Sequence, residues 1–169
     1  MKPWQQVFSI LLPGTSIGGL VYDKFNGRFW FPKRGVLVER TFHLIDQEKN
    51  KLGRALAQNP YQNLLFLPDG NHWGLRVKDK LQQFRDNGTI VPGSVFQLPS
   101  DYFKGATRTI EWMEYSKKIA IADYTGRLIF FDPKTQKIEF REFSNLLKGA
   151  SGEIKSVTED RYGNFWAAI

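Results

Sequence analysis

The sequence contains no cysteine among its 169 residues and only two histidines. The lack of cysteine excludes disulfide frameworks, thiolate zinc sites and cysteine nucleophiles. The two histidines, His43 and His72, form no His-x-x-x-His or Glu-x-x-His spacing, so there is little material for a metal site or a general base. We therefore expect no catalytic residue, no metal and no cofactor in this chain.

Long apolar runs are also missing. No stretch approaches the roughly 20 apolar residues that span a bilayer, so we expect no membrane segment. The apolar run at 7–12 is about six residues, shorter than the roughly 7–15 of a signal peptide, and Pro13-Gly14 follows it without a small-x-small cleavage pattern. A strand that ends in a Pro-Gly turn is the better interpretation of this segment.

The composition is that of a globular chain rich in strand-forming residues. Hydrophobic residues make up 41% and aromatic residues 15%, which excludes disorder caused by low hydrophobicity. The net charge is +7, but the basic residues occur as scattered pairs such as Lys33-Arg34 and Lys117-Lys118 rather than as one stripe. The sequence therefore predicts no nucleic-acid partner.

The chain contains an internal repeat in which glycine stands three residues before tryptophan. Clear copies occupy 23–30, 68–73 and 160–166, and a degenerate copy has Lys117 in the glycine place and Ala120 in the tryptophan place. The four anchors lie 43, 47 and 46 residues apart, and they are Trp30, Trp73, Ala120 and Trp166. A period of 40–50 residues is typical of β-propeller blades.

Strand-like runs surround each anchor. First strands are predicted at 19–22, 63–67, 109–113 and 154–158, and third strands at 36–38, 80–84 and 127–131. The clearest unit adds a fourth, strictly alternating strand at 137–143. Helical character is confined to 52–57, where a short helix or a loop is expected. Each unit of about 45 residues therefore holds four strands.

The predicted fold class is all-β, an incomplete β-propeller of three to four blades built from four-stranded antiparallel units. The whole chain, 1–169, forms one propeller segment, in which 1–14 closes a preceding blade and 149–169 is half a blade. Whole blades are expected at 15–60, 61–104 and 105–148. Because closed propellers usually have four to eight blades, either the remaining blades of a parent chain or a homodimer partner would complete the ring.

Residues that recur at the blade period are assigned to structure. The glycines supply positive φ in the hairpin turn, the aspartates accept backbone N–H groups there, and the tryptophans fill the space between blades. These residues are Gly27, Gly70 and Gly163; Asp23, Asp69 and Asp160; and Trp30, Trp73 and Trp166. His72 is expected to be a partly exposed turn residue, and His43 a strand residue.

The segments 126–138 and 156–166 closely resemble the repeat of two-component regulator propellers, with Phe-Asp-Pro-x-Thr at 131–135 and a Gly-Asn turn before Trp166. The third copy departs from the pattern by lacking both Gly and Trp. The resemblance implies the extracytoplasmic sensor of a hybrid two-component system, in which histidine kinase and response regulator share one chain. It also implies a non-catalytic role, a periplasmic location and an oligosaccharide as the ligand.

Two other interpretations remain open. The same turns resemble streptogramin-lyase-like propellers, which are enzymes, and a third possibility is a protein-interaction scaffold. For a polar ligand, the candidates are non-recurring residues at the face opposite the first-to-second-strand turns, where convergent polar and aromatic groups form a channel mouth. They are Arg34, Lys78, Arg108 and Tyr124.

Overall fold

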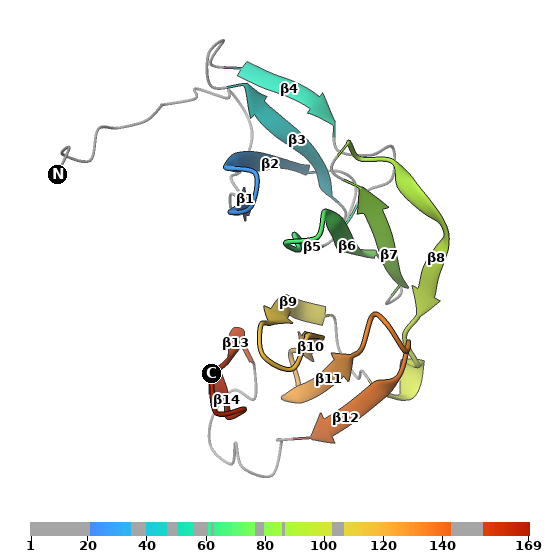
Figure 1. Ribbon diagram of the computed structural model, residues 1–169, viewed down its shortest axis with the longest axis vertical. Helices are drawn as coiled ribbons and strands as arrows, with labels where there is room; N and C mark the ends of the chain where they lie inside the picture. The colour runs from blue at the N-terminus through green and yellow to red at the C-terminus, as the bar shows by residue number, and fades with distance from the viewer. Residues whose placement is uncertain are drawn as a thin grey trace, which may run out of the picture. The chain divides into compact units, whose positions relative to one another are not determined.

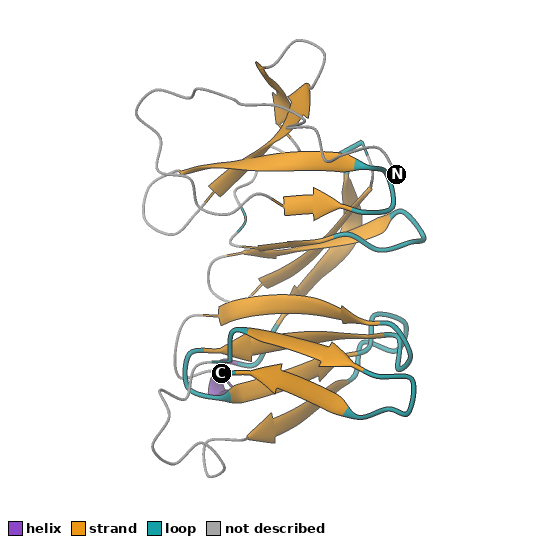
Figure 2. Cartoon of the chain, turned by 90° about the vertical axis from the view of Figure 1, so that its left-hand side faces the viewer, coloured by secondary structure: helices purple, strands orange, loops and turns teal. Residues whose placement is uncertain are grey.

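The structure of the protein is a computed structural model. It describes residues 21–34, 40–46, 51–55, 61, 63–76, 80–85, 87–102, 107–142 and 154–169, without the side chains of 31–34, 40–46, 51–55, 107 and 108. Regular structure in these ranges is β-strand, apart from the 3-10 turn η1 (Ser100–Tyr102) (Figure 2). Within them no helix has the length and apolar character needed to cross a membrane. The prediction of an all-β chain is confirmed.

Three four-stranded sheets follow one another along the chain, and in each the strands are neighbours in chain order (Figure 1). The first contains β1 (Val21–Asp23), β2 (Arg28–Arg34), β3 (Arg40–Asp46) and β4 (Lys51–Ala55). The second contains β5 (Asn63–Leu65), β6 (Asn71–Arg76), β7 (Lys80–Arg85) and β8 (Ile90–Gln97). The third contains β9 (Thr107–Met113), β10 (Lys118–Asp123), β11 (Arg127–Phe131) and β12 (Ile138–Glu142). A fourth, two-stranded sheet pairs β13 (Ser156–Glu159) with β14 (Phe165–Ala168).

The chain divides into two compact units, which are described separately. The first unit holds the described residues of 1–77 and 82–95, which are sheet β1–β4 and most of sheet β5–β8. The second holds those of 78–81 and 96–169, which include sheets β9–β12 and β13–β14.

The turn between the first and second strands is tight in every sheet because one residue adopts a left-handed backbone. The φ angles are 63° at Gly27, 75° at Gly70 and 81° at Gly163. In the degenerate third copy, Lys117 adopts φ 56°, so the conformation persists without the glycine. An L-residue in this region costs roughly 1–2 kcal/mol, which explains the glycine in the other copies.

In the first unit, a tryptophan on the second strand joins one sheet to the next. Trp30 pairs with Val21 across β1–β2, and its ring stacks on Phe66 of the following sheet with centroids 6.0 Å apart. Tyr61, Leu64 and Phe84 complete this buried cluster. Because the Trp30 side chain is 1% exposed, the two sheets cover it almost entirely.

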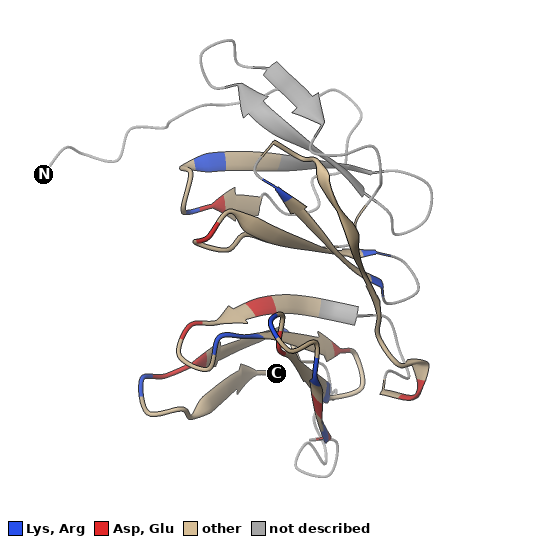
Figure 3. Ribbon diagram, turned by 45° about the vertical axis from the view of Figure 1, so that its right-hand side comes forward, with Lys and Arg blue, Asp and Glu red and all other residues tan. Residues whose placement is uncertain are grey.

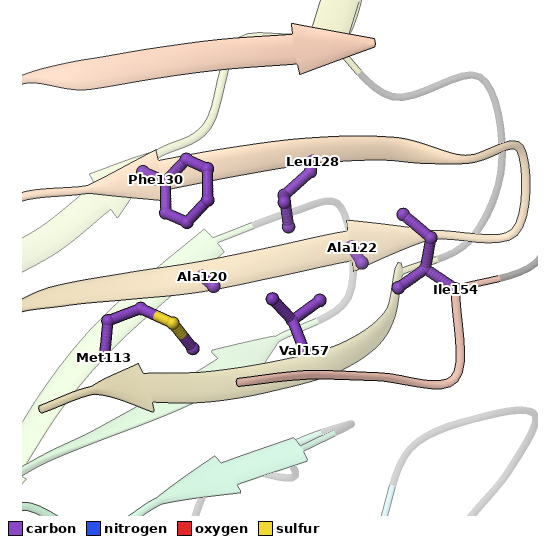
Figure 4. Packing of buried hydrophobic residues seen from close by; sticks show 7 residues of the cluster. All are labelled: Met113, Ala120, Ala122, Leu128, Phe130, Ile154 and Val157. Carbon is purple, nitrogen blue, oxygen red and sulfur yellow. The ribbon is translucent and has the colours of Figure 1, made fainter. Parts of the chain in front are cut away.

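The third sheet packs on the fourth although Ala120 replaces the tryptophan. Met113 and Phe130 pack beside Ala120, together with Val157 of β13 and with Ile154 from the segment just before it (Figure 4). Phe165 of β14 lies 4.5 Å from the Phe130 ring. The contact between these two sheets is therefore made by two phenylalanines and a methionine packed around Ala120.

Three local expectations differ from the structure or lie outside it. The helix or loop expected at 52–57 is wrong for its first residues, because β4 pairs Leu52 with Ile45 and hydrogen bonding to a neighbouring strand overrides local helix propensity. The third strand of the first sheet is β3, whereas the run predicted at 36–38 lies outside the described residues. The strand expected at 6–12 lies outside them too.

Gly74 provides a test of how closely the strands approach Tyr61. A Cβ atom at Gly74 would stand 2.3 Å from the Tyr61 Cδ1 atom, which is far inside van der Waals contact. We expect Gly74→Ala to lower the free energy of unfolding by roughly 1–3 kcal/mol, the usual cost of overpacking. In a Tyr61→Ala background, the same substitution should cost much less. Urea denaturation of the four proteins measures this coupling, and additive costs would contradict the packing described.

Candidate functional site

One predicted ligand residue, Tyr124, lies in a turn whose surroundings are described. Asp123 at the end of β10 pairs with Thr107 at the start of β9, so the turn at 124–126 leaves the sheet at the edge where β9 begins. Gly126 has φ 81° and leads the chain into β11. The Tyr124 side chain is 42% exposed at this edge. We call this turn with its supporting residues the β10–β11 site.

Asp123 fixes the backbone of the turn. Its Oδ1 atom accepts hydrogen bonds from the Thr125 N–H at 2.8 Å, the Thr125 hydroxyl at 2.9 Å and the Arg127 N–H at 3.0 Å. The Asp123 side chain is fully buried. Because a carboxylate that accepts several local donors restricts the backbone around it, Tyr124 is presented from a rigid turn.

Arg127 connects the turn to two other elements. Its Nη1 atom donates to the Asp101 carbonyl in η1 at 3.0 Å, and its Nη2 atom lies 3.6 Å from the Glu142 carboxylate at the end of β12. The guanidinium also stands 5.7 Å from the centroid of the Phe140 ring. Because Arg127 is buried, these contacts replace the water that its charge loses.

A pair of stacked rings extends this support. Tyr102 of η1 and Phe140 of β12 lie 4.9 Å apart at an angle of 9°. The β10–β11 site is therefore an exposed tyrosine on a fixed turn, supported by buried polar and aromatic contacts. Such a surface stacks on flat apolar faces and leaves polar groups at its rim for hydrogen bonds.

Of the four sequence-predicted ligand residues, the structure describes the side chain of Tyr124 alone. Tyr124 is described in full, and Arg108 lies in β9 beside the edge where the Tyr124 turn leaves the sheet. Arg34 is the last residue of β2, in the other unit, and neither its side chain nor that of Arg108 is described. Lys78 lies outside the described residues.

Of the two histidines, His72 is the one whose side chain the structure describes, and it is engaged in packing. His72 was expected to be a partly exposed turn residue, but it lies in β6 and is fully buried, because its ring packs against Phe66 and Phe84. Its Nδ1 atom accepts the Leu67 N–H at 2.9 Å. Burial raises the pKa of the Glu111 carboxyl, although a hydrogen bond from Thr109 opposes the rise. In the part of the chain that is described, no three His, Cys, Asp or Glu residues gather as metal ligands do.

A second polar and aromatic surface lies at the other end of the second unit, on the β9–β10 and β13–β14 turns. Glu159 links the turns, since its Oε2 atom accepts the N–H groups of Tyr115 and Ser116, both at 2.9 Å. Tyr115 and Tyr162 are exposed, and the Arg161 guanidinium stands 4.7 Å from the Tyr162 ring centroid. Charged residues gather on these turns and along β12 (Figure 3). We call Tyr115, Arg161 and Tyr162 the hairpin-turn surface.

Sequence reasoning missed the hairpin-turn surface because it treated these turns only as structural repeats. Tyr162 directly precedes the repeated Gly163, and Tyr115 occupies the corresponding region of the degenerate copy. Phe25 stands in the corresponding turn of the first copy, with the Lys24 ammonium 5.0 Å from its ring centroid, so the repeat itself gave no signal that set these two turns apart.

The carboxylates of the repeated turns accept backbone hydrogen bonds, as residues in this position are expected to do. Asp69 accepts the Asn71 N–H at 3.0 Å. Asp160 accepts those of Tyr162 and Asn164, and its Oδ2 atom accepts the Asn164 side-chain amide and the Trp166 indole N–H. These bonds, with that of the Asn164 amide the largest, lower the pKa of Asp160 to about 2.

Comparisons with known proteins were made at the levels of sequence and fold. No protein-family model and no curated protein matches the chain. Among solved structures, the Neurospora crassa Pan2 WD40 domain superposes with a TM-score of 0.55 at 13% identity, covering 91% of this chain and 44% of that one. The β-propeller domain of Myceliophteria thermophila Cps50 (Swd1) gives a TM-score of 0.54 at 16% identity, covering 89% of this chain and 50% of that one. BBS1N, solved in complex with ARL6DN, gives 0.55 at 11% identity, covering 95% and 51%.

These similarities show that the chain has a β-propeller fold. Its four-stranded sheets are propeller blades, and the pair β13–β14 corresponds to the first two strands of a further blade. The chain spans about half the length of the solved chains that it matches.

Substitution of Asp123 tests the rigidity of the β10–β11 site. Asp123→Ala removes the acceptor of three hydrogen bonds and leaves buried donors without a partner, so we expect the free energy of unfolding to fall by roughly 2–3 kcal/mol. Asp123→Asn keeps one oxygen acceptor and should cost clearly less. Urea denaturation measures both values, and equal, negligible costs would show that the turn does not depend on this carboxylate.

The low pKa of Asp160 predicts a pH dependence of the β13–β14 turn. An aspartate in the unfolded chain titrates near 3.9, whereas Asp160 in the folded turn titrates at about 2. Its contribution to stability is therefore present above about pH 4 and is lost as the pH falls towards 2. The NMR signal of the Trp166 indole N–H should shift over this range, and Asp160→Asn should abolish the shift. A midpoint near 4 in the wild-type protein would contradict this assignment.

Proposed function

We propose that this chain is a non-catalytic ligand-binding part of a sensor that recognises an oligosaccharide through the β10–β11 site. The observation that carries the proposal is Tyr124, an exposed ring on a turn held by the buried Asp123 carboxylate. The resemblance of 126–166 to two-component regulator propellers supports the same role. In that setting the chain belongs to the periplasmic sensor of a hybrid two-component histidine kinase and response regulator.

The chemistry of the site suits a sugar. The C–H face of a pyranose packs on a tyrosine ring, while its hydroxyl groups need donors and acceptors close to that ring. Tyr124 supplies the ring and its own hydroxyl group, and the Thr125 hydroxyl oxygen, whose hydrogen is donated to Asp123, can still accept a hydrogen bond. Because the turn is already ordered, little conformational entropy is lost when a ligand binds.

The same contacts provide a route by which binding could alter the sensor. Asp123 joins the turn to the start of β11, and Arg127 joins β11 to η1 and to the end of β12. A ligand that contacts Tyr124 differently in two arrangements of these elements would shift the equilibrium between them. The signal then passes to a kinase through parts of the protein other than these strands.

A matched pair of tyrosine substitutions tests the proposal. Purified protein is titrated with an array of oligosaccharides from plant and animal polysaccharides, and binding is measured by calorimetry. Tyr124→Ala should weaken binding at least tenfold because the stacking surface is lost, whereas Tyr124→Trp should retain binding. Tyr162→Ala removes an even more exposed ring, 73% against 42%, from the β13–β14 turn at the other end of the second unit, and it should have no effect.

Two outcomes would overturn the proposal. One is the lack of saturable binding by any oligosaccharide at millimolar concentration, with wild-type circular dichroism. The other is cleavage of a bound oligosaccharide, which would indicate an enzyme of the lyase type instead.

A protein-interaction scaffold is the second candidate function, and the hairpin-turn surface favours it. Tyrosine and arginine are enriched at the energetic centres of protein interfaces, and Tyr115, Arg161 and Tyr162 lie on adjacent linked turns. One chain of similar fold, BBS1N, was solved in complex with another protein, ARL6DN. If this function holds, Tyr162→Ala should weaken binding of a protein partner and Tyr124→Ala should not.

A further inference from the structure

The contact between Trp30 and Phe66 shows how one blade packs against the next in this chain. Trp30 pairs with Val21 and stacks on Phe66, which directly follows β5. Phe66 is the residue after Leu65, and Leu65 pairs with Trp73 just as Val21 pairs with Trp30. In each blade, one residue of the first strand pairs with the tryptophan of the second strand. The tryptophan of the preceding blade stacks on the residue that comes directly after that paired residue.

Trp166 occupies the same place as Trp30, but its ring is uncovered. It pairs with Thr158 across β13–β14 and stands three residues after the left-handed Gly163. Its side chain is 63% exposed, against 1% for Trp30. The other face of β13–β14 is occupied, because Val157 and Phe165 pack into the cluster shown in Figure 4.

The face around Trp166 is formed and ordered. The indole N–H donates to the Asp160 carboxylate at 3.1 Å, which holds the ring in one orientation. Its neighbours on the face are small or polar residues, namely Ser156, Thr158 and Ala168, and all three are exposed. An incoming ring can therefore lie flat on Trp166 without meeting a bulky side chain.

The first sheet of the chain carries the complementary residue. Tyr22 follows Val21 and so occupies in β1–β2 the position that Phe66 occupies in the second sheet. It stacks on its cross-strand neighbour Phe29 at 4.7 Å, as Phe66 contacts His72 at 4.9 Å, and it is 53% exposed. Phe66 is covered by Trp30 of the preceding blade. Within the described residues, no tryptophan of a preceding blade covers Tyr22 in the same way.

We propose that Trp166 of one chain packs on Tyr22 of a second copy of this chain. A contact between two different faces can be made twice in a pair of molecules, once in each direction, which gives a closed dimer. The inference rests on the fold and is independent of the oligosaccharide-binding proposal.

Complementation between two variants tests this contact. The mass of the purified full chain is measured by light scattering coupled to size exclusion at micromolar concentration, and wild-type protein should have the mass of a dimer. Trp166→Ser and Tyr22→Ser should each have the mass of a monomer, because every contact then lacks one ring. An equimolar mixture of the two variants should partly recover the dimer, because one intact Trp166–Tyr22 contact is possible in the mixed pair.

Tyr162→Ser is the control, since Tyr162 is exposed but lies on the hairpin-turn surface, and this variant should remain dimeric. Circular dichroism checks that each variant folds. For folded variants, recovery of the dimer in the mixture of Trp166→Ser and Tyr22→Ser shows that the two rings contact each other. A monomeric wild-type protein would overturn the proposal and leave the Trp166 face for another polypeptide. Dimers that persist in both single variants would overturn it as well.

Discussion

The packing of one sheet face on the next is the interaction on which the rest of this structure depends. A four-stranded sheet of this size cannot bury its apolar residues alone, so each blade is stable only against a neighbour. Trp30 provides the contact in the first unit, where Tyr61, Phe66 and Phe84 surround it. The turns that carry the candidate sites lie at the ends of strands that this contact holds together.

The third blade shows that the contact can be maintained without its usual residues. Ala120 stands at the tryptophan place, and Phe130 and Phe165 pack in the same cluster with their ring centroids 4.5 Å apart. The Arg141 guanidinium lies 5.4 Å from the centroids of both rings and covers the cluster from β12. Lys117 similarly keeps the left-handed backbone of the glycine that it replaces. The geometry is therefore a property of the blade, and several combinations of side chains can satisfy it.

The sequence was sufficient to predict the four-stranded units because glycine, turn residues and alternating strands repeat at a fixed spacing. It predicted β11 at its observed bounds and β7 to within one residue. It failed for β4, where pairing with β3 decides the conformation, and for the burial of His72, which depends on the neighbouring rings of Phe66 and Phe84. The support of Tyr124 by Arg127, Asp101 and Glu142 was also not predictable, because these contacts join segments that no repeat relates.

Glu159 has a consequence for the order in which the chain is made. The turn N–H groups of Tyr115 and Ser116 bond to a carboxylate that lies 44 and 43 residues further along the chain. On the ribosome, the β9–β10 hairpin therefore emerges with these donors still bonded to water. It reaches its final form only after Glu159 of the next blade has been synthesised, so this hairpin is completed one blade behind the growing end of the chain.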